Sequence, residues 1–161
     1  MKAIYTLAIA AILTAPVFAS EMPKEGKYDY FSCWSATNNV MPLPDETVAI
    51  GYELTGSTRA ATPGGMFDKN TFHCIGAGTM RDGKTIGSRT ACMAIDADGD
   101  KRVAIFTNEN GKDTRHDVTG TGKYKGMEIT DPVVENLGPL PVVKEGTTQA
   151  CNHQTGTYKL K

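Results

Sequence analysis

The stretch TFHCIGAGTMRDGKTIGSRTACMAI, residues 71–95, decides the fold because it contains two strand-like runs around the turn sequence Arg-Asp-Gly. Strand-forming runs on either side of Asp-Gly are typical of a β-hairpin. A loop centred on Gly83 places Cys74, nine residues before it, opposite Cys92, nine residues after it. Cross-strand partners have Cβ atoms about 4.5–5.5 Å apart, which permits a disulfide after modest adjustment. The sequence therefore predicts a hairpin with a Cys74–Cys92 disulfide.

The rest of the chain repeats this strand-like pattern. Similar runs occur at KYDYFSCW (27–34), TVAIGYELTG (47–56) and KRVAIFT (101–107), with glycines, threonines and turn dipeptides between them. No segment of helical length keeps apolar residues at the three-and-four spacing of an amphipathic helix. The pattern indicates an all-β domain of antiparallel strands joined by short turns.

Two further cysteines lie near the two ends of the chain. Cys33 and Cys151 meet if the first and last strands are neighbours, as in a closed barrel. Four cysteines allow three pairings, so free or differently paired thiols remain an alternative. The preferred connectivity is Cys33–Cys151 with Cys74–Cys92.

The first 19 residues predict a signal peptide. A lysine is followed by an apolar run from Ala3 to Leu13, then Pro16, then the small-residue pattern ending at Ala19. This run is shorter than the roughly 18–20 residues of a membrane span. We expect cleavage after Ala19, one domain over residues 20–161, and a periplasmic or secreted location where disulfides form. No integral membrane segment is expected in the mature chain.

The charge balance argues against a nucleic-acid partner. Lys2 is the only charged residue among the first 19, so the remaining chain carries 16 basic and 18 acidic residues. A basic face for nucleic acid is not expected from this balance.

The segment GTGKYKG, residues 120–126, can be interpreted as a phosphate-binding loop or as a β-corner. The glycine spacing does not match a dinucleotide-binding motif, and Gly122-Lys123 is followed by Tyr124 where a P-loop needs Ser or Thr. The corner reading fits better, because Gly120 and Gly122 permit sharp backbone bends and Tyr124 can fill the space beside them. In this reading Lys123 is solvated.

The same segment resembles the Gly-Thr-Gly-[Lys/Arg]-[Tyr/Phe] corner of allene oxide cyclase-like and dirigent-like β-barrels. FHCIGAG, AC and DADGDK also look like segments of secreted bacterial members of that group, and the likeness covers residues 72–127. The resemblance implies a small closed antiparallel barrel of about eight strands. It carries over no catalytic residue, so a cyclase or isomerase activity follows from analogy alone.

Residues 131–146, DPVVENLGPLPVVKEG, combine apolar side chains with three prolines. The prolines predict an irregular loop. This loop either packs on the outside of the core or caps the mouth of a cavity. In the second reading Leu137, Leu140 and Val142 contact a ligand, together with Trp34, which is expected at a barrel end.

No cofactor or metal is expected. Asp96, Asp98 and Asp100 alternate as in a calcium loop, but Lys101 and Thr107 replace the glycine and glutamate of an EF-hand. A type I′ turn on Asp98-Gly99 with solvated carboxylates is the preferred reading, with calcium as the alternative. The histidines at 73, 116 and 153 lack the spacing of a zinc or haem site.

The sequence favours a small-ligand-binding barrel over two other classes of function. An eight-stranded barrel is wide enough to hold one small ligand, here expected to be apolar. The alternatives are a structural or inhibitory envelope protein that contacts another macromolecule, and a cyclase or isomerase. No catalytic residue is assigned, so the chain is more simply read as a binder than as an enzyme.

Overall fold

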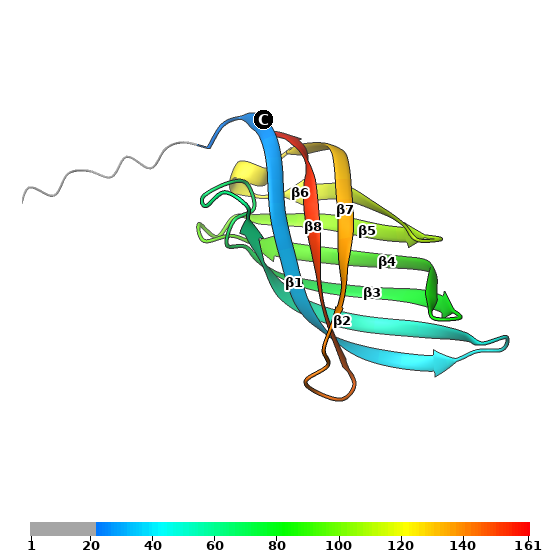
Figure 1. Cartoon of the computed structure of the whole chain (residues 1–161). Helices are drawn as coiled ribbons and strands as arrows, with labels where there is room; N and C mark the ends of the chain where they lie inside the picture. Colours follow the sequence, from blue (N-terminus) through cyan, green and yellow to red (C-terminus); the bar gives the residue numbers. More distant parts are fainter. Residues whose placement is uncertain (1–21) are drawn as a thin grey trace, which may run out of the picture.

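The computed structural model describes residues 22–161, which form a nearly closed all-β barrel (Figure 1). The predicted signal peptide lies outside the described residues. The strands are β1 (Glu25–Pro42), β2 (Thr47–Ala60), β3 (Thr71–Arg81), β4 (Lys84–Ile95), β5 (Lys101–Glu109), β6 (Lys112–Gly120), β7 (Glu128–Leu140) and β8 (Thr147–Lys159), with a 3-10 turn η1 (Gly122–Tyr124) between β6 and β7. No helix in the described range is long and apolar enough to cross a membrane.

All neighbouring strands are antiparallel, in the order β6-β5-β4-β3-β2-β1-β8-β7. The first and last strands therefore pair, as the terminal cysteines predicted. The backbone ladder ends at β6 and β7, which form the seam of the barrel. One side-chain hydrogen bond spans this seam, from Asn136 Nδ2 to Asp113 Oδ2 at 2.7 Å.

Both predicted disulfides are confirmed. Cys33 is bonded to Cys151 between β1 and β8, and Cys74 to Cys92 between β3 and β4. The Cys74–Cys92 register arises in an unexpected way. Asp82-Gly83, both with positive φ, form a two-residue turn that pairs Arg81 with Lys84, and a bulge next to Thr79–Met80 then shifts the register by one residue. Without this bulge, Cys74 would face Ala91.

The prediction of an irregular loop over residues 131–146 is wrong for its first part, because β7 extends to Leu140. Pro132 and Pro139 lie at two register shifts in the pairing of β7 with β8. β7 is also an edge strand, where a missing backbone N–H costs little. Only residues 141–146 form the connection to β8.

Alternation along the strands puts even-numbered side chains of β1, β3, β5 and β8 inside the barrel. One end of the barrel, which we call the plugged end, contains the start of β1, the end of β8 and loops 61–70, 96–100 and 121–127. The other end, which we call the open end, contains the hairpin turns 43–46, 82–83, 110–111 and 141–146. The strand pairs diverge at the open end in Figure 1.

Candidate functional site

The plugged end is filled by aromatic side chains, and a loop inserts into it. Phe67, in the β2–β3 loop, is 1% exposed, and its ring centroid lies 5.3 Å from those of Tyr28 and Tyr30 and 6.0 Å from that of Tyr124. The Thr58 hydroxyl donates to the Phe67 carbonyl at 2.5 Å. The Gly- and Pro-rich loop between β2 and β3, residues 61–70, is therefore the internal plug of the barrel.

The Gly120–Tyr124 corner borders this plug. A Cβ atom at Gly120 would lie 2.5 Å from the Tyr124 carbonyl oxygen. Gly122 has φ +49°, and a Cβ there would overlap the Asp100 carboxylate. Tyr124 is buried in the aromatic cluster. The geometry thus matches a corner built around two glycines and a tyrosine.

Lys123 was expected to be solvated, and this is wrong. Its Nζ lies 2.8 Å from Asp96 Oδ2 and 2.6 Å from Asp98 Oδ2, and the Asp96 side chain is only 5% exposed. The turn is not type I′ either, because only Gly99 among its residues has positive φ. Burial opposes ionisation of Asp96, but hydrogen bonds led by that from Lys123 lower its pKa overall. The ammonium group bridges two of the three carboxylates that resembled a calcium loop.

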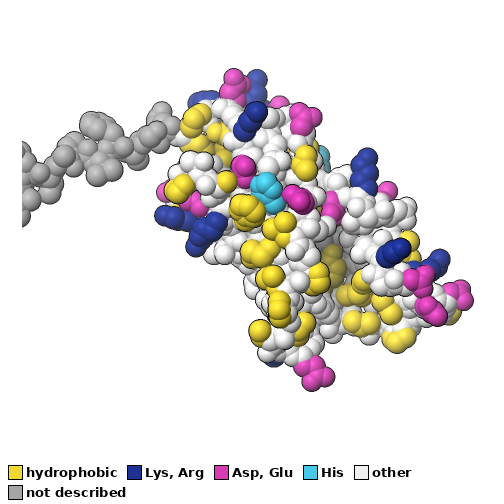
Figure 2. Space-filling model, in the orientation of Figure 1, with side chains coloured by type: hydrophobic (Ala, Val, Ile, Leu, Met, Phe, Trp, Pro, Cys, Tyr) yellow, Lys and Arg dark blue, Asp and Glu magenta, His cyan; other side chains and the backbone are white. Residues whose placement is uncertain are grey.

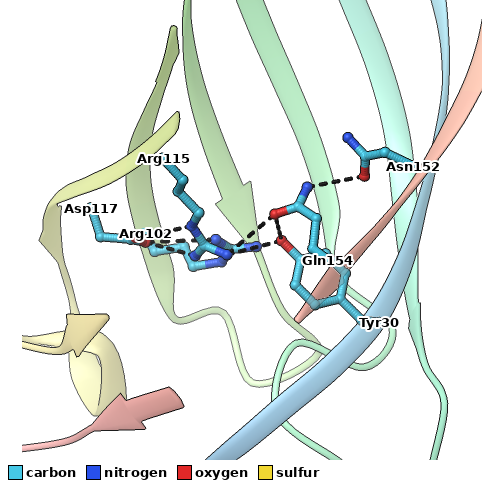
Figure 3. Close-up of polar contacts among 6 residues, drawn as sticks. All are labelled: Tyr30, Arg102, Arg115, Asp117, Asn152 and Gln154. Atoms are coloured by element: carbon cyan, nitrogen blue, oxygen red, sulfur yellow. Dashed lines mark hydrogen bonds and ion pairs between the residues drawn. The ribbon is translucent and has the colours of Figure 1, made fainter. Parts of the chain in front are cut away.

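Two buried arginines lie next to the aromatic plug and form the floor of the barrel interior (Figure 3). Arg115 forms a bidentate salt bridge with Asp117. Its Nε donates to Asp117 Oδ2 at 2.7 Å and its Nη2 donates to Asp117 Oδ1 at 2.8 Å. Its Nη1 also donates to the Tyr30 hydroxyl at 3.0 Å. The Tyr30 hydroxyl in turn donates to Gln154 Oε1 at 2.5 Å. Each guanidinium nitrogen of Arg115 therefore donates a hydrogen bond.

Arg102 is placed differently. It is 5% exposed, and its guanidinium carbon lies 4.0 Å from the centroid of the Phe67 ring. Its nearest acidic contact is Nη1 to Asp117 Oδ1 at 3.7 Å, which is beyond hydrogen-bond range. Its Nε has no hydrogen-bond partner in the part of the chain that the structure describes. Both arginines therefore contact the Asp117 carboxylate, and the contact of Arg102 is the longer one.

The shifts in pKa follow from this arrangement. Burial lowers the pKa of Arg102, and the positive charge of Arg115 lowers it further. Burial acts in the same direction on Arg115, but Tyr30 and Asp117 outweigh it and raise the pKa overall. Burial also raises the pKa of Tyr28 to about 12. Because arginine stays protonated in proteins, the floor carries two positive charges against one negative charge.

Above this floor lies a cavity of about 150 Å³. Its wall combines aromatic and aliphatic side chains with small ones such as Ser32, Ala94 and Ala104, which leave space that the plugged end does not have. Arg102, Asn152 and Gln154 supply polar groups at the floor. The Cys74–Cys92 disulfide also lines the wall, whereas Cys33–Cys151 lies on the outward register of β1.

The interior continues toward the open end as a second hollow of about 400 Å³. Trp34, Leu54 and Thr90 line both spaces. The hydroxyls of Tyr52 and Thr90 lie 2.6 Å apart at the second hollow's wall. Figure 2 shows the surface hollowed between the two diverging parts of the barrel, with hydrophobic side chains on both sides.

The predicted ligand-contacting residues divide into two groups. Trp34 lines the cavity. Leu137, Leu140 and Val142 do not line it and are 47%, 45% and 60% exposed. Val134, on the other face of β7, lines the wall instead.

The paired histidines lie on the outward face of their strands, away from the cavity. His73 contacts Glu53 and His153 contacts Asp29, both on exposed parts of the surface. Within residues 22–161 no group of His, Cys, Asp and Glu is arranged to hold a metal ion. The cavity offers hydrogen-bonding groups, a positive charge and apolar walls, which is chemistry for binding.

No protein-family model, curated protein or solved structure matches this chain. The resemblance to allene oxide cyclase-like and dirigent-like barrels therefore stays a prediction.

Proposed function

We propose that this protein is an exported barrel that binds one small, largely apolar molecule in its interior. The observation that carries the proposal is the cavity between the floor and the open end, lined by Trp34, Leu54, Phe72, Phe106 and Val134. An apolar cavity of about 150 Å³ accepts a molecule the size of benzene, and a larger molecule can extend into the hollow of about 400 Å³ toward the open end. The two disulfides support export to an oxidising compartment.

A fluorescent probe tests this proposal. The neutral compound N-phenyl-1-naphthylamine should bind with increased emission and should receive energy from Trp34, the only tryptophan in the chain. Native mass spectrometry of protein purified from its own periplasm should in addition detect a retained small molecule. A probe that binds with no energy transfer from Trp34 would place binding outside the cavity.

A matched pair of variants locates the binding. Ala104→Leu adds bulk inside the cavity, whereas Ala91→Leu adds the same bulk on the outward register of the neighbouring strand. Because about 1.4 kcal/mol corresponds to a factor of ten, loss of a few methyl contacts should lower probe affinity about tenfold in the first variant. The second variant should bind as the wild type does. Equal affinities in both variants would contradict the proposal.

A second candidate function is contact with another macromolecule in the envelope. It is favoured by the outward apolar side chains of β7 and the turn after it, including Val133, Leu137 and Leu140. In that case Leu137→Ser/Leu140→Ser should remove a specific co-purifying protein while Ala104→Leu retains it. A cyclase or isomerase activity is supported by the sequence resemblance alone.

A further inference from the structure

The floor of the cavity contains a buried positive group with an unused donor. Arg102 lines the cavity and is 5% exposed, and its Nε has no hydrogen-bond partner among the described residues. A buried N–H on a charged group is costly when unpaired, and it forms strong bonds with anions. A ligand oxygen placed at this Nε would satisfy the group.

The charges around Arg102 leave it under-compensated. Among residues 22–161, Asp117 is the only acidic side chain that contacts it, and this carboxylate already accepts two hydrogen bonds from Arg115. The aromatic face of Phe67 covers the guanidinium at 4.0 Å on one side, which cannot replace a counter-charge. An anion entering the cavity would bring the floor to electrical balance.

Asp113, the acidic residue that lines the cavity wall, lies far from this floor. Asp113 pairs in register with Asn108, six residues along β5 from Arg102. At about 3.3 Å per residue, this is about 20 Å along the strand. Its oxygens accept hydrogen bonds from Asn108 at 2.8 Å and Asn136 at 2.7 Å. The cavity is therefore positive at its floor and acidic toward its open end.

We propose that the natural ligand is a slender amphipathic monoanion, with a carboxylate-type head paired to Arg102 and an apolar body extending toward Trp34. This inference rests on the proposed binding function and specifies its ligand class. The head is expected to contact the Arg102 Nε and the amide of Asn152 or Gln154, and the body to contact the apolar wall. No bond is made or broken.

The test uses three compounds with the same ring and different charges: benzoate, benzyl alcohol and benzylammonium. Calorimetry on the purified protein, in buffer without added chloride, should rank their affinities in that order. One charge-assisted hydrogen bond at a buried group predicts a preference of about tenfold or more for benzoate over benzyl alcohol. Equal affinities, or tighter binding of benzyl alcohol, would overturn the inference.

Two variants assign the preference to one residue. Arg102→Gln leaves Arg115 and Asp117 as a balanced pair, so it should fold and lose the preference for benzoate over benzyl alcohol. Arg89→Gln makes the same change in net charge at an exposed position of β4 and should retain the preference. A preference that survives in Arg102→Gln would also overturn the inference.

A measurement on the wild type keeps the test valid if Arg102→Gln does not fold. Benzoate should shift the Arg102 Nε–H resonance, assigned through its bonds to the Arg102 backbone because both arginines lie over the Phe67 ring, and benzyl alcohol should shift it much less. The two proposals fail separately. If benzyl alcohol binds and benzoate does not, the anion inference fails alone, and if none of the three compounds binds, the cavity-binding function fails as well.

Discussion

The two ends of the barrel are built from the same strands and are filled in opposite ways. At the plugged end, Tyr28, Tyr30 and Phe67 pack together with two arginines, and nearly all of their surface is buried. Toward the open end, the same strands present Ser32, Ala36 and Ala104 on the corresponding interior face. The difference indicates that side-chain size along each strand, and not the strand ladder, decides where a small barrel is solid and where it is hollow.

The largest effect expected of a single substitution is on the plug. Phe67→Ala removes a fully buried ring and should lower the free energy of unfolding by about 3–5 kcal/mol in urea titrations. Leu54→Ala, on the cavity wall, should cost less, because the space beside Leu54 is already partly empty. Similar losses in both variants would mean that the hollow half is as well packed as the plugged half.

Alkaline pH should weaken the plugged end. Burial raises the pKa of Tyr28 and of Tyr124 from 10.0 to about 12. Between these values the unfolded chain has released the phenolic proton and the folded chain has not. The stabilisation is therefore complete below pH 10 and is lost as the pH rises toward 12.

The double variant Tyr28→Phe/Tyr124→Phe isolates this effect. Each raised pKa corresponds to roughly 2–3 kcal/mol lost by pH 12, at about 1.4 kcal/mol per pKa unit. Urea titrations from pH 9 to 12 should show a shallower fall for the variant than for the wild type. Identical slopes would show that other groups control the alkaline transition.

Two glycines, one at each end, test the backbone in the same way. Gly122→Ala should cost about 2–3 kcal/mol, because it combines positive φ with overlap on the Asp100 carboxylate. Gly83→Ala, in the open-end hairpin, should cost only about 1 kcal/mol, since φ is also positive there but no atom lies within 4 Å of the added Cβ. Thermal or urea unfolding of both variants measures the difference, and equal losses would remove the special role of the corner.

The fold was largely predictable from the sequence because its evidence is local. Turn dipeptides and alternating runs mark the strands, and the position of the cysteines relative to Gly83 gave their pairing. That pairing was correct although the turn is centred between Asp82 and Gly83, because a bulge restores the register. The pairing of β1 with β8 followed from barrel closure between Cys33 and Cys151.

The candidate site was much less predictable. Arg102 lies on the interior face of β5 with Ala104 and Phe106, while Val103 and Ile105 lie on the outer face. Hydrophobic alternation in this strand therefore predicts that Val103 and Ile105 point inward, because they are more hydrophobic than Arg102 and Ala104. Only the register with β4 and β6 places the arginine inside. Phe67 was missed for a related reason, because a single aromatic residue in a Gly- and Pro-rich loop does not reveal that the loop folds inward.

The smallest expected effect concerns the outer face of the open half, and it separates the cavity from the apolar strand beside it. The sequence predicted that Leu137 and Leu140 cover a cavity mouth, but both are nearly half exposed and neither lines the interior. Leu137→Ser/Leu140→Ser should therefore change the free energy of unfolding by less than about 1 kcal/mol and leave probe affinity unchanged. The urea midpoint and the N-phenyl-1-naphthylamine titration on this variant measure both quantities.

The variant Val134→Ser, which changes the inward face of the same strand, should weaken probe binding because its side chain lines the cavity. If the double variant lost probe binding and Val134→Ser retained it, the ligand would lie against the outside of β7, and the hollow interior would not be the site.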